Sequence, residues 1–281
     1  MRINANIMAI NSHRQLGGLV AQQGKATEKL SSGFRINRAA DDAAGLAISE
    51  KMRAQIRGMS QASRNAQDGI SVVQTAEGAL DEVHSILQRM KELAVQSANG
   101  SNQDDDRKLI QKEVDQLKSE IDAIAEKTQF NKMKLLAGNG TDPLSMTFQV
   151  GANKAGAAKA EEITIKISSI KVASLFELDD NVISLQTAEG AKNLMSSVEG
   201  AIIKLATSRA DLGAVQNRLE HTIKNLDNAV ENLTASESRI RHTDMAKEMM
   251  EFTRTNILNQ AAQAMLAQAN QLPQGVLQLL R

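Results

Sequence analysis

Large aliphatic residues recur at every seventh position in the C-terminal third of the chain. The row consists of Val198, Leu205, Leu212, Leu219, Leu226, Leu233 and Ile240. Smaller residues follow six of them at a distance of three, which produces the alternating three-and-four spacing of a coiled-coil seam: Ala201, Ser208, Val215, Thr222, Ala229 and Ser236. Because a helix rises about 1.5 Å per residue, residues 192–240 alone predict a helix of roughly 70 Å. Such a helix exceeds the width of an ordinary small globular domain.

Two segments of the N-terminal half supply partners for this helix. Residues 59–94 carry the same apolar alternation, with Gly69 as the one interruption, and residues 110–124 repeat it over a shorter stretch. Asp104, Asp105 and Asp106 stand in the first turn of the shorter helix, where acidic side chains interact favourably with the helix dipole. We predict an antiparallel three-helix coiled-coil rod with left-handed winding.

The middle of the chain changes to the two-residue period of β-strands. After a turn cluster at residues 138–143, apolar residues alternate with polar ones over residues 144–150 and again over residues 163–168. We expect a β-hairpin at about residues 144–168. Because a two-stranded hairpin is marginally stable alone, it should pack on the rod. The predicted fold class is therefore mainly α, with a small β-hairpin region.

Both ends of the chain carry thin amphipathic stripes, at residues 4–32 and 258–279. We expect the two terminal helices to pair as a coiled coil and still leave apolar surface that neighbouring molecules must cover. The seam that we assign to polymerisation consists of Ile7, Ile10, Leu30, Leu258, Met265, Leu272, Val276 and Leu279. Pro273 predicts a bend in the second helix, and a stop at Leu272 is the alternative.

Composition argues against several other classes of protein. The 33 basic residues balance 33 acidic ones, so no net charge draws the chain to nucleic acid or anionic lipid. Cysteine is absent and the four histidines are scattered, so neither a thiolate nor a His-Glu-x-x-His metal site is available. Asp41 and Asp42 precede an alanine-rich run, which makes them helix caps rather than catalytic carboxylates. We predict no catalytic, cofactor or metal site.

No apolar run is long enough to cross a bilayer, and no conventional signal peptide is visible. Export, if it occurs, is expected to use a route that does not read a cleavable leader.

Four stretches of the sequence carry a family resemblance. Residues 30–49 read LSSGFRINRAADDAAGLAIS, and they are joined by QDGIS at 67–71, LGAVQNRL at 212–219 and the ending from residue 264 to Arg281. Together they resemble the bacterial flagellins, in a short form that lacks the large outer domains. The family usually has leucine, arginine and glycine where this chain has Phe34, Lys91 and Lys132, so the local resemblance is weakest near Lys132.

The resemblance implies a structural subunit that is exported unfolded through the flagellar type III apparatus and polymerises with itself into the extracellular filament used for swimming. It implies that residues 1–40 and 242–281 form an inner helical layer and residues 41–241 the rod. Implied partners are the filament cap, the hook-junction proteins and a secretion chaperone, with the chaperone on Phe252, Ile257, Leu258, Met265 and Leu266. A hook-filament junction protein is the alternative. A secreted enzyme on this scaffold is a third class, but the short middle contains no histidine.

The resemblance also implies a receptor contact. Arg89, Leu93 and Glu113 match positions that Toll-like receptor 5 reads in recognised flagellins. Contacts between neighbouring subunits explain the same three residues about equally well, since we expect all three to be exposed on the rod.

Overall fold

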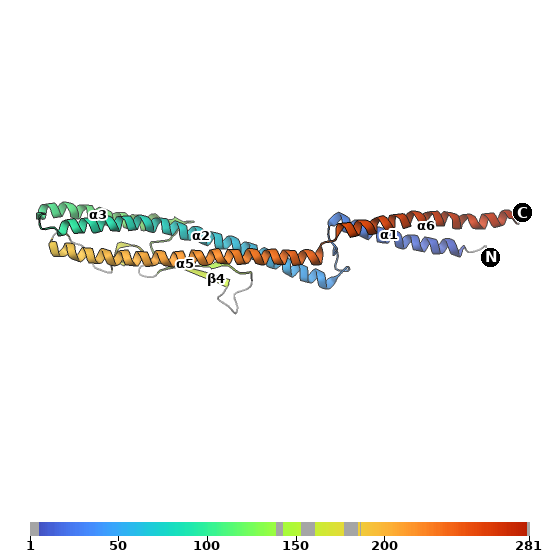
Figure 1. Cartoon of the computed structure of the whole chain (residues 1–281), viewed down its shortest axis with the longest axis horizontal. Helices are drawn as coiled ribbons and strands as arrows, with labels where there is room; N and C mark the ends of the chain where they lie inside the picture. Colours follow the sequence, from blue (N-terminus) through green and yellow to red (C-terminus); the bar gives the residue numbers. More distant parts are fainter. Residues whose placement is uncertain (1–5, 139–142, 153–160, 177–184, 186, 280–281) are drawn as a thin grey trace. The chain divides into compact units, whose positions relative to one another are not determined.

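The computed structural model describes residues 6–138, 143–152, 161–176, 185 and 187–279, without the side chains of residues 188 and 272–279. Six helices are present in these ranges (Figure 1). They are α1 (Ile7–Ser32), α2 (Ala43–Ala98), α3 (Asp104–Lys127), α4 (Val172–Phe176), α5 (Ala188–Arg241) and α6 (Met245–Leu279). The chain forms two compact units, Met1–Ile56 with Glu231–Arg281, and Arg57–Val230. We call them the terminal unit and the central unit.

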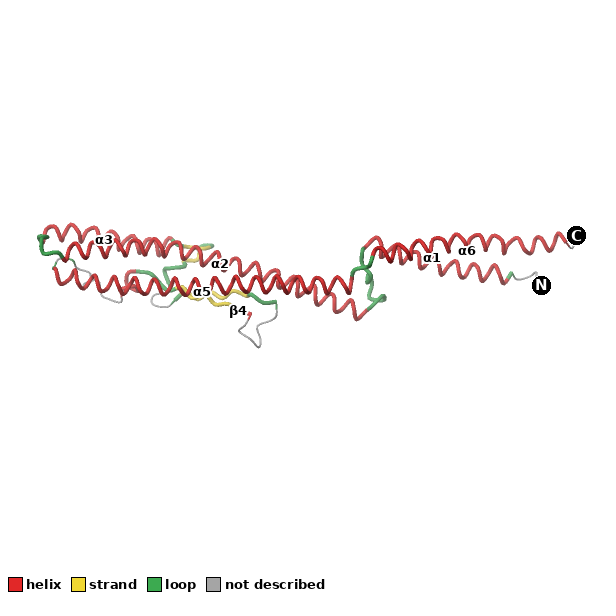
Figure 2. The backbone as a smooth tube through the Cα atoms, viewed as in Figure 1, coloured by secondary structure: helices red, strands yellow, loops and turns green. Residues whose placement is uncertain are grey.

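In the central unit α2, α3 and α5 run side by side (Figure 2). The heptad row of α5 is fully buried at Val198, Leu205, Leu212 and Leu219, each at most 1% exposed. It packs in one core with residues of α2 such as Leu80, Leu87 and Met90, and with Val114 and Ile121 of α3. The predicted mainly α fold with a helical coiled coil is confirmed.

The heptad row continues beyond Leu219 with lower burial. Leu226, Leu233 and Ile240 are half-buried. The apolar core of the central unit, to which the strand residues Ile163, Ile165 and Ile167 belong, includes Leu219 but none of these three. The heptad repeat therefore extends to Ile240, whereas its side chains are fully buried only as far as Leu219.

The predicted hairpin is present as β3 (Leu144–Gln149) and β4 (Glu162–Ile167), paired antiparallel from Leu144 opposite Ile167 to Gln149 opposite Glu162. One face of β4 is buried through its three isoleucines. The hairpin approaches α2 at Gly69, where an added Cβ would lie 3.3 Å from Leu219 Cδ1 and 3.5 Å from Phe148 Cγ. Gly69, which interrupts the apolar alternation, is thus a place where α2, α5 and the hairpin meet.

A second, shorter hairpin joins β1 (Gln129–Phe130) to β2 (Met133–Lys134) and was not predicted. Its two turn residues, Asn131 and Lys132, have φ values of 47° and 65°. Positive φ at both central residues is the pattern of a tight hairpin turn, in which glycine is usual at the second position. Because residue 132 is lysine, the sequence lacks the Asn-Gly pair that usually identifies such a turn.

No helix in the described part of the chain is long and apolar enough to cross a membrane.

Candidate functional site

The terminal unit is built on α1 and α6, which lie side by side in antiparallel directions (Figure 1). Asn6 caps the start of α1, since its Oδ1 accepts a hydrogen bond from Ala9 N at 3.1 Å. Gly33 ends the helix in the left-handed conformation at φ 73° and donates its N–H to Lys29 O at 2.8 Å. This is the C-terminal stop expected of a glycine.

The buried and half-buried side chains of both helices follow the three-and-four spacing of a coiled coil. On α1 they are Ala9, Ser12, Leu16, Leu19, Gln23, Ala26 and Leu30. On α6 they are Glu248, Phe252, Thr255, Asn259, Ala262, Leu266 and Ala269. We call these two rows the internal seam. Small and polar residues make up most of it, so the pairing of α1 with α6 buries little aliphatic surface.

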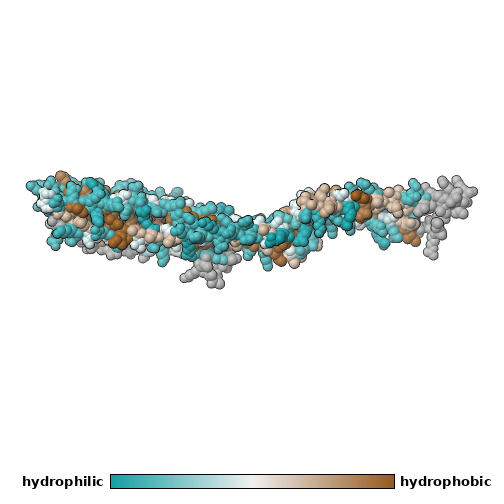
Figure 3. All heavy atoms as spheres, viewed as in Figure 1, coloured by the Kyte–Doolittle hydropathy of each residue, from teal (hydrophilic) through white to brown (hydrophobic). Residues whose placement is uncertain are grey.

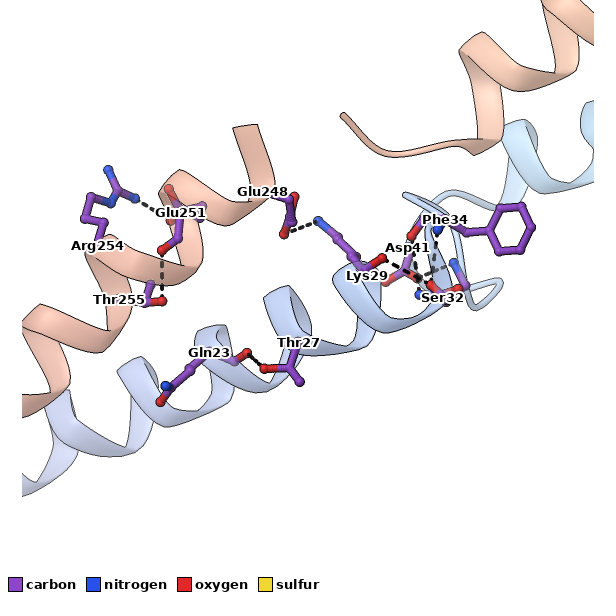
Figure 4. Close-up of polar contacts among 11 residues, drawn as sticks. Gln23, Thr27, Lys29, Ser32, Phe34, Asp41, Glu248, Glu251, Arg254 and Thr255 are labelled. Atoms are coloured by element: carbon purple, nitrogen blue, oxygen red, sulfur yellow. Dashed lines mark hydrogen bonds and ion pairs between the residues drawn. The ribbon is translucent and has the colours of Figure 1, made fainter. Parts of the chain in front are cut away.

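Among the described side chains, three polar contacts link the two helices. Asn6 Nδ2 donates to Ala269 O at 2.7 Å, and Asn259 Nδ2 donates to Gln23 Oε1 at 2.8 Å. Figure 4 shows Lys29 of α1 reaching toward Glu248 of α6, with an ion-pair distance of 3.7 Å. The contacts pair the start of α1 with the far part of α6, as antiparallel helices require.

Several large aliphatic side chains of the terminal helices lie outside the internal seam. Ile7 and Ile10 are both 62% exposed, Leu258 is 44% exposed and Met265 is 62% exposed. Val20, Met249, Met250 and Ile257 are exposed as well, and Figure 3 shows apolar surface over the terminal helices. We call this surface the outer apolar face.

Five of the eight residues assigned to the polymerisation seam have described side chains. Four of them lie on the outer apolar face, while Leu30 belongs to the internal seam. The side chains of Leu272, Val276 and Leu279 lie outside the described residues. The backbone of α6 continues to Leu279, so the alternative in which the helix stops at Leu272 is wrong, whereas the bend at Pro273 stays a prediction.

The residues assigned to the chaperone occupy both sides of α6. Ile257, Leu258 and Met265 are exposed, whereas Phe252 and Leu266 are half-buried in the internal seam. A partner that contacts all five side chains requires α6 to be separated from α1.

A clasp joins the turn after α1 to the turn before α6. Phe34 and His242 form an isolated antiparallel bridge, and the Arg241 guanidinium lies 4.9 Å from the centre of the Phe34 ring. Arg35 donates from its backbone N to Arg241 O at 2.7 Å, and Thr243 N donates to Gly33 O at 3.0 Å. Sequence reasoning missed this clasp, because no residue spacing links positions 34 and 242.

Asp42 caps α2 as the sequence predicts, whereas Asp41 holds the turn before the helix. Asp41 Oδ2 accepts hydrogen bonds from Asn37 N at 3.1 Å and Arg38 N at 3.0 Å, and Asp42 Oδ1 accepts one from Gly45 N at 2.8 Å. The backbone hydrogen bonds from Arg38 and Asn37 hold the pKa of Asp41 below its ordinary value of 3.8. Within the described residues no three histidines or carboxylates are grouped to hold a metal ion.

The predicted receptor residues lie in the central unit. Arg89 donates to Glu113 of α3 at 2.9 Å and to Glu92 at 3.1 Å, and these two carboxylates raise the pKa of Arg89 above its ordinary value. Arg89 and Glu113 are exposed, but Leu93 is 2% exposed and belongs to the core. The expectation of an exposed Leu93 is wrong. Leu93 follows the core residue Met90 by three positions, a spacing that indicates a buried residue.

The paired terminal helices, the helical bundle and the outer apolar face define an α-helical subunit built to associate with further chains. Comparison with known proteins then identifies the family. Residues 3–141 match the bacterial flagellin N-terminal helical region, and residues 195–280 match the bacterial flagellin C-terminal helical region. The chain belongs to the bacterial flagellin family.

Two flagellins agree with this assignment over their whole length. The chain is 58% identical to a flagellin of Halalkalibacterium halodurans and 51% identical to a flagellin of Bacillus subtilis, with full coverage of each pair. A crystal structure of Bacillus cereus flagellin, 33% identical, aligns with 58% of this chain and 88% of that chain at a TM-score of 0.47. The protein is a structural subunit of the extracellular flagellar filament, and these matches give the hook-filament junction alternative no better support.

Proposed function

We propose that copies of this chain polymerise through the outer apolar face, with residues 1–40 and 242–281 forming the inner layer of the filament and residues 41–241 the rod. The exposure of Ile7, Ile10, Leu258 and Met265 carries the proposal. Covering one such side chain stabilises an assembly by about 1.5–3 kcal/mol. The exposed aliphatic residues on both helices therefore favour association between subunits, whereas the side chains of the internal seam are already covered within one subunit.

The proposal is tested by seeded growth of filaments, followed by light scattering and electron microscopy. Leu258→Ser and Met265→Ser should each raise the critical concentration about tenfold or more, because each removes one covered aliphatic side chain. Ile203→Ser is the matched control, since Ile203 is 66% exposed but lies in the central unit. Equal growth of all three variants contradicts the proposed surface. A chain without residues 1–40 and 242–281 should not elongate the seeds.

We propose further that the chain leaves the cell unfolded through the flagellar type III apparatus, with the secretion chaperone bound to Phe252, Ile257, Leu258, Met265 and Leu266. The positions of these side chains on both sides of α6 support a chaperone complex in which α1 and α6 are separated. Calorimetric titration of the full-length chain with the flagellin chaperone of the same bacterium provides the test.

A disulfide between Ala26→Cys and Thr255→Cys, both in the internal seam, should abolish chaperone binding, and its reduction should restore it. Undiminished binding by the oxidised chain contradicts a separated α6. The cap and hook-junction proteins are proposed as partners on family grounds.

A receptor function is proposed for Arg89 and Glu113, with Toll-like receptor 5 as the partner. Their exposure on adjacent helices supports it, and the burial of Leu93 assigns that residue to the core beneath them. Arg89→Ala should weaken a receptor-reporter response to monomer. Arg209→Ala removes a partly exposed ion pair, with Asp81 at 3.0 Å, and should leave the response unchanged. Equal responses to both variants refute the proposal.

We also propose that the subunit is purely structural and catalyses no reaction. The structural roles of Asp41 and Asp42 support this, since one oxygen of each carboxylate accepts hydrogen bonds from backbone N–H groups.

A further inference from the structure

The internal seam contains one side-chain amide pair that joins the two helices. Asn259 Nδ2 donates to Gln23 Oε1 at 2.8 Å in a partly buried position, and Gln263 adds a weaker contact to Asn259 Oδ1 at 3.5 Å along α6. The neighbouring seam positions are Leu19 and Ala26 on α1, and Thr255 and Ala262 on α6. The amide pair is thus enclosed by apolar or small side chains.

The residues one heptad away from this pair are all large and apolar. Seven positions before and after Gln23 stand Leu16 and Leu30, and seven positions before and after Asn259 stand Phe252 and Leu266. A slip of one heptad in one direction therefore places Asn259 opposite Leu16 and Gln23 opposite Phe252. A slip in the other direction places them opposite Leu30 and Leu266. Either slip leaves both amides without their present partner, and a partly buried polar group without a partner is destabilising.

The other two contacts between the helices lie near the two ends of α1. Asn6 donates to the backbone carbonyl of Ala269, which has no helical donor because Pro273, four positions later, lacks an N–H; this contact favours the present register, but only at the start of α1. The Lys29–Glu248 pair has an N–O distance of 3.7 Å, and Lys29 is 32% exposed, so its contribution is small. The small side chains of the seam, among them Ala9 and Ala269, provide little shape that would resist a slip.

We propose that the Gln23–Asn259 pair fixes the register of the α1–α6 coiled coil along its length, beyond the clasp that joins its ends, by excluding the two one-heptad slips. The principle is the one by which a buried polar residue at a core position selects the alignment of a coiled coil at some cost in stability. Gln23 and Asn259 are accordingly positioning residues for the proposed assembly surface, which lies outside the internal seam on the same helices.

Disulfide trapping tests the proposal in full-length filaments, because the chain contains no cysteine of its own. Ala26→Cys with Thr255→Cys reports the register seen here, and Ala26→Cys with Ala262→Cys reports a slip of one heptad. The ratio of these two disulfides within single chains is measured after oxidation, by mass spectrometry. In the otherwise native chain the first disulfide should dominate.

Replacing the amides by Gln23→Leu with Asn259→Leu should lower that ratio about tenfold or more, because no unpaired amide then opposes the slip. Exchanging them by Gln23→Asn with Asn259→Gln should preserve it. The matched control is Gln22→Leu with Gln260→Leu, which replaces two exposed amides of the same helices and should leave the ratio unchanged. An unchanged ratio in the first variant overturns the proposal and assigns the register to other contacts.

If the double-leucine variant grows no filaments alone, it is added as a minor component to native chain, and the same ratio is measured in the mixed filaments. Exclusion of this variant from mixed filaments while the exchange variant enters also supports the proposal. Exclusion of both variants overturns the proposal, because incorporation into the filament then does not depend on whether the two amides can pair.

Discussion

Phe34 and His242 lie opposite each other in an antiparallel bridge, with their ring centroids 5.2 Å apart. They stand 208 positions apart in the sequence by their numbering, and each belongs to the connection between two long helices. Arg241 lies over the Phe34 ring and its Nη1 also donates to Glu50 of α2 at 2.6 Å. The two connections of the terminal unit are therefore held together by side chains as well as by backbone hydrogen bonds.

Phe34→Ala should loosen this clasp. It removes the ring contact with His242 and the cation–π contact with Arg241, together worth about 1 kcal/mol. Hydrogen exchange of the Arg35 and Thr243 amides in filaments should accelerate about fivefold, because both donate across the clasp. Phe34→Tyr keeps the ring and is the control. Native exchange rates in Phe34→Ala would falsify a stabilising role for the ring.

Acid should weaken the turn at Asp41. The pKa of Asp41 is lower in the folded chain than its ordinary value of 3.8, so its contribution to stability is fully present above that value and is lost as pH falls through the folded pKa. Exchange of the Asn37 and Arg38 amides, which donate to Asp41, should become faster in that range. Asp41→Asn should remove this part of the pH dependence; an identical acid response in Asp41→Asn contradicts the assignment.

Truncation within the heptad row should destabilise the central unit. Leu212 is 1% exposed, so Leu212→Ala leaves a cavity and should lower the free energy of unfolding by about 2–5 kcal/mol. Ile203→Ala on the same helix removes a side chain that is 66% exposed and should change it by less than about 0.5 kcal/mol. Urea unfolding of the monomer, followed by circular dichroism, measures both. Similar losses in the two variants would be inconsistent with the core described here.

Two glycines of α2 should respond differently to alanine. An added Cβ at Gly78 meets no atom within 4 Å, so Gly78→Ala should stabilise the helix by about 0.5–1 kcal/mol. Gly69 stands against Leu219 and Phe148, and Gly69→Val should destabilise the monomer by about 1–3 kcal/mol through overpacking. The same urea experiment compares them. Stabilisation by Gly69→Val would show that the hairpin does not press on α2.

The sequence was sufficient to predict the long helices, their shared core and the main hairpin, because each depends on a period that repeats over many residues. Predicted strands at 144–150 and 163–168 are close to the observed Leu144–Gln149 and Glu162–Ile167. Features that depend on a single turn were missed. The β1–β2 hairpin has Lys132 at a positive φ where glycine is usual, and the five-residue helix α4 is too short for a periodic signal.

Periodicity was less informative for the terminal helices, where it identifies stripes without showing which partner covers them. The spacing of Leu258 and Met265 is a true heptad, yet the side of α6 that meets α1 passes through Thr255, Asn259 and Ala262. Small and polar residues carry a weak hydrophobic signal, so the predicted seam included Leu30 of the internal seam but not Gln23 or Asn259. A search for residues at seam spacing irrespective of hydropathy would have found Gln23 and Asn259.

The amide pair in the terminal helices affects how uniform the subunits of a filament are in length. A slip of one heptad shifts one helix against the other by about 10 Å along its axis. In a polymer made of one kind of subunit, such an error would be repeated at every joint that the altered chain makes with its neighbours. The hydrogen bond between Gln23 and Asn259 thus sets the axial offset between α1 and α6, which must be the same in every subunit.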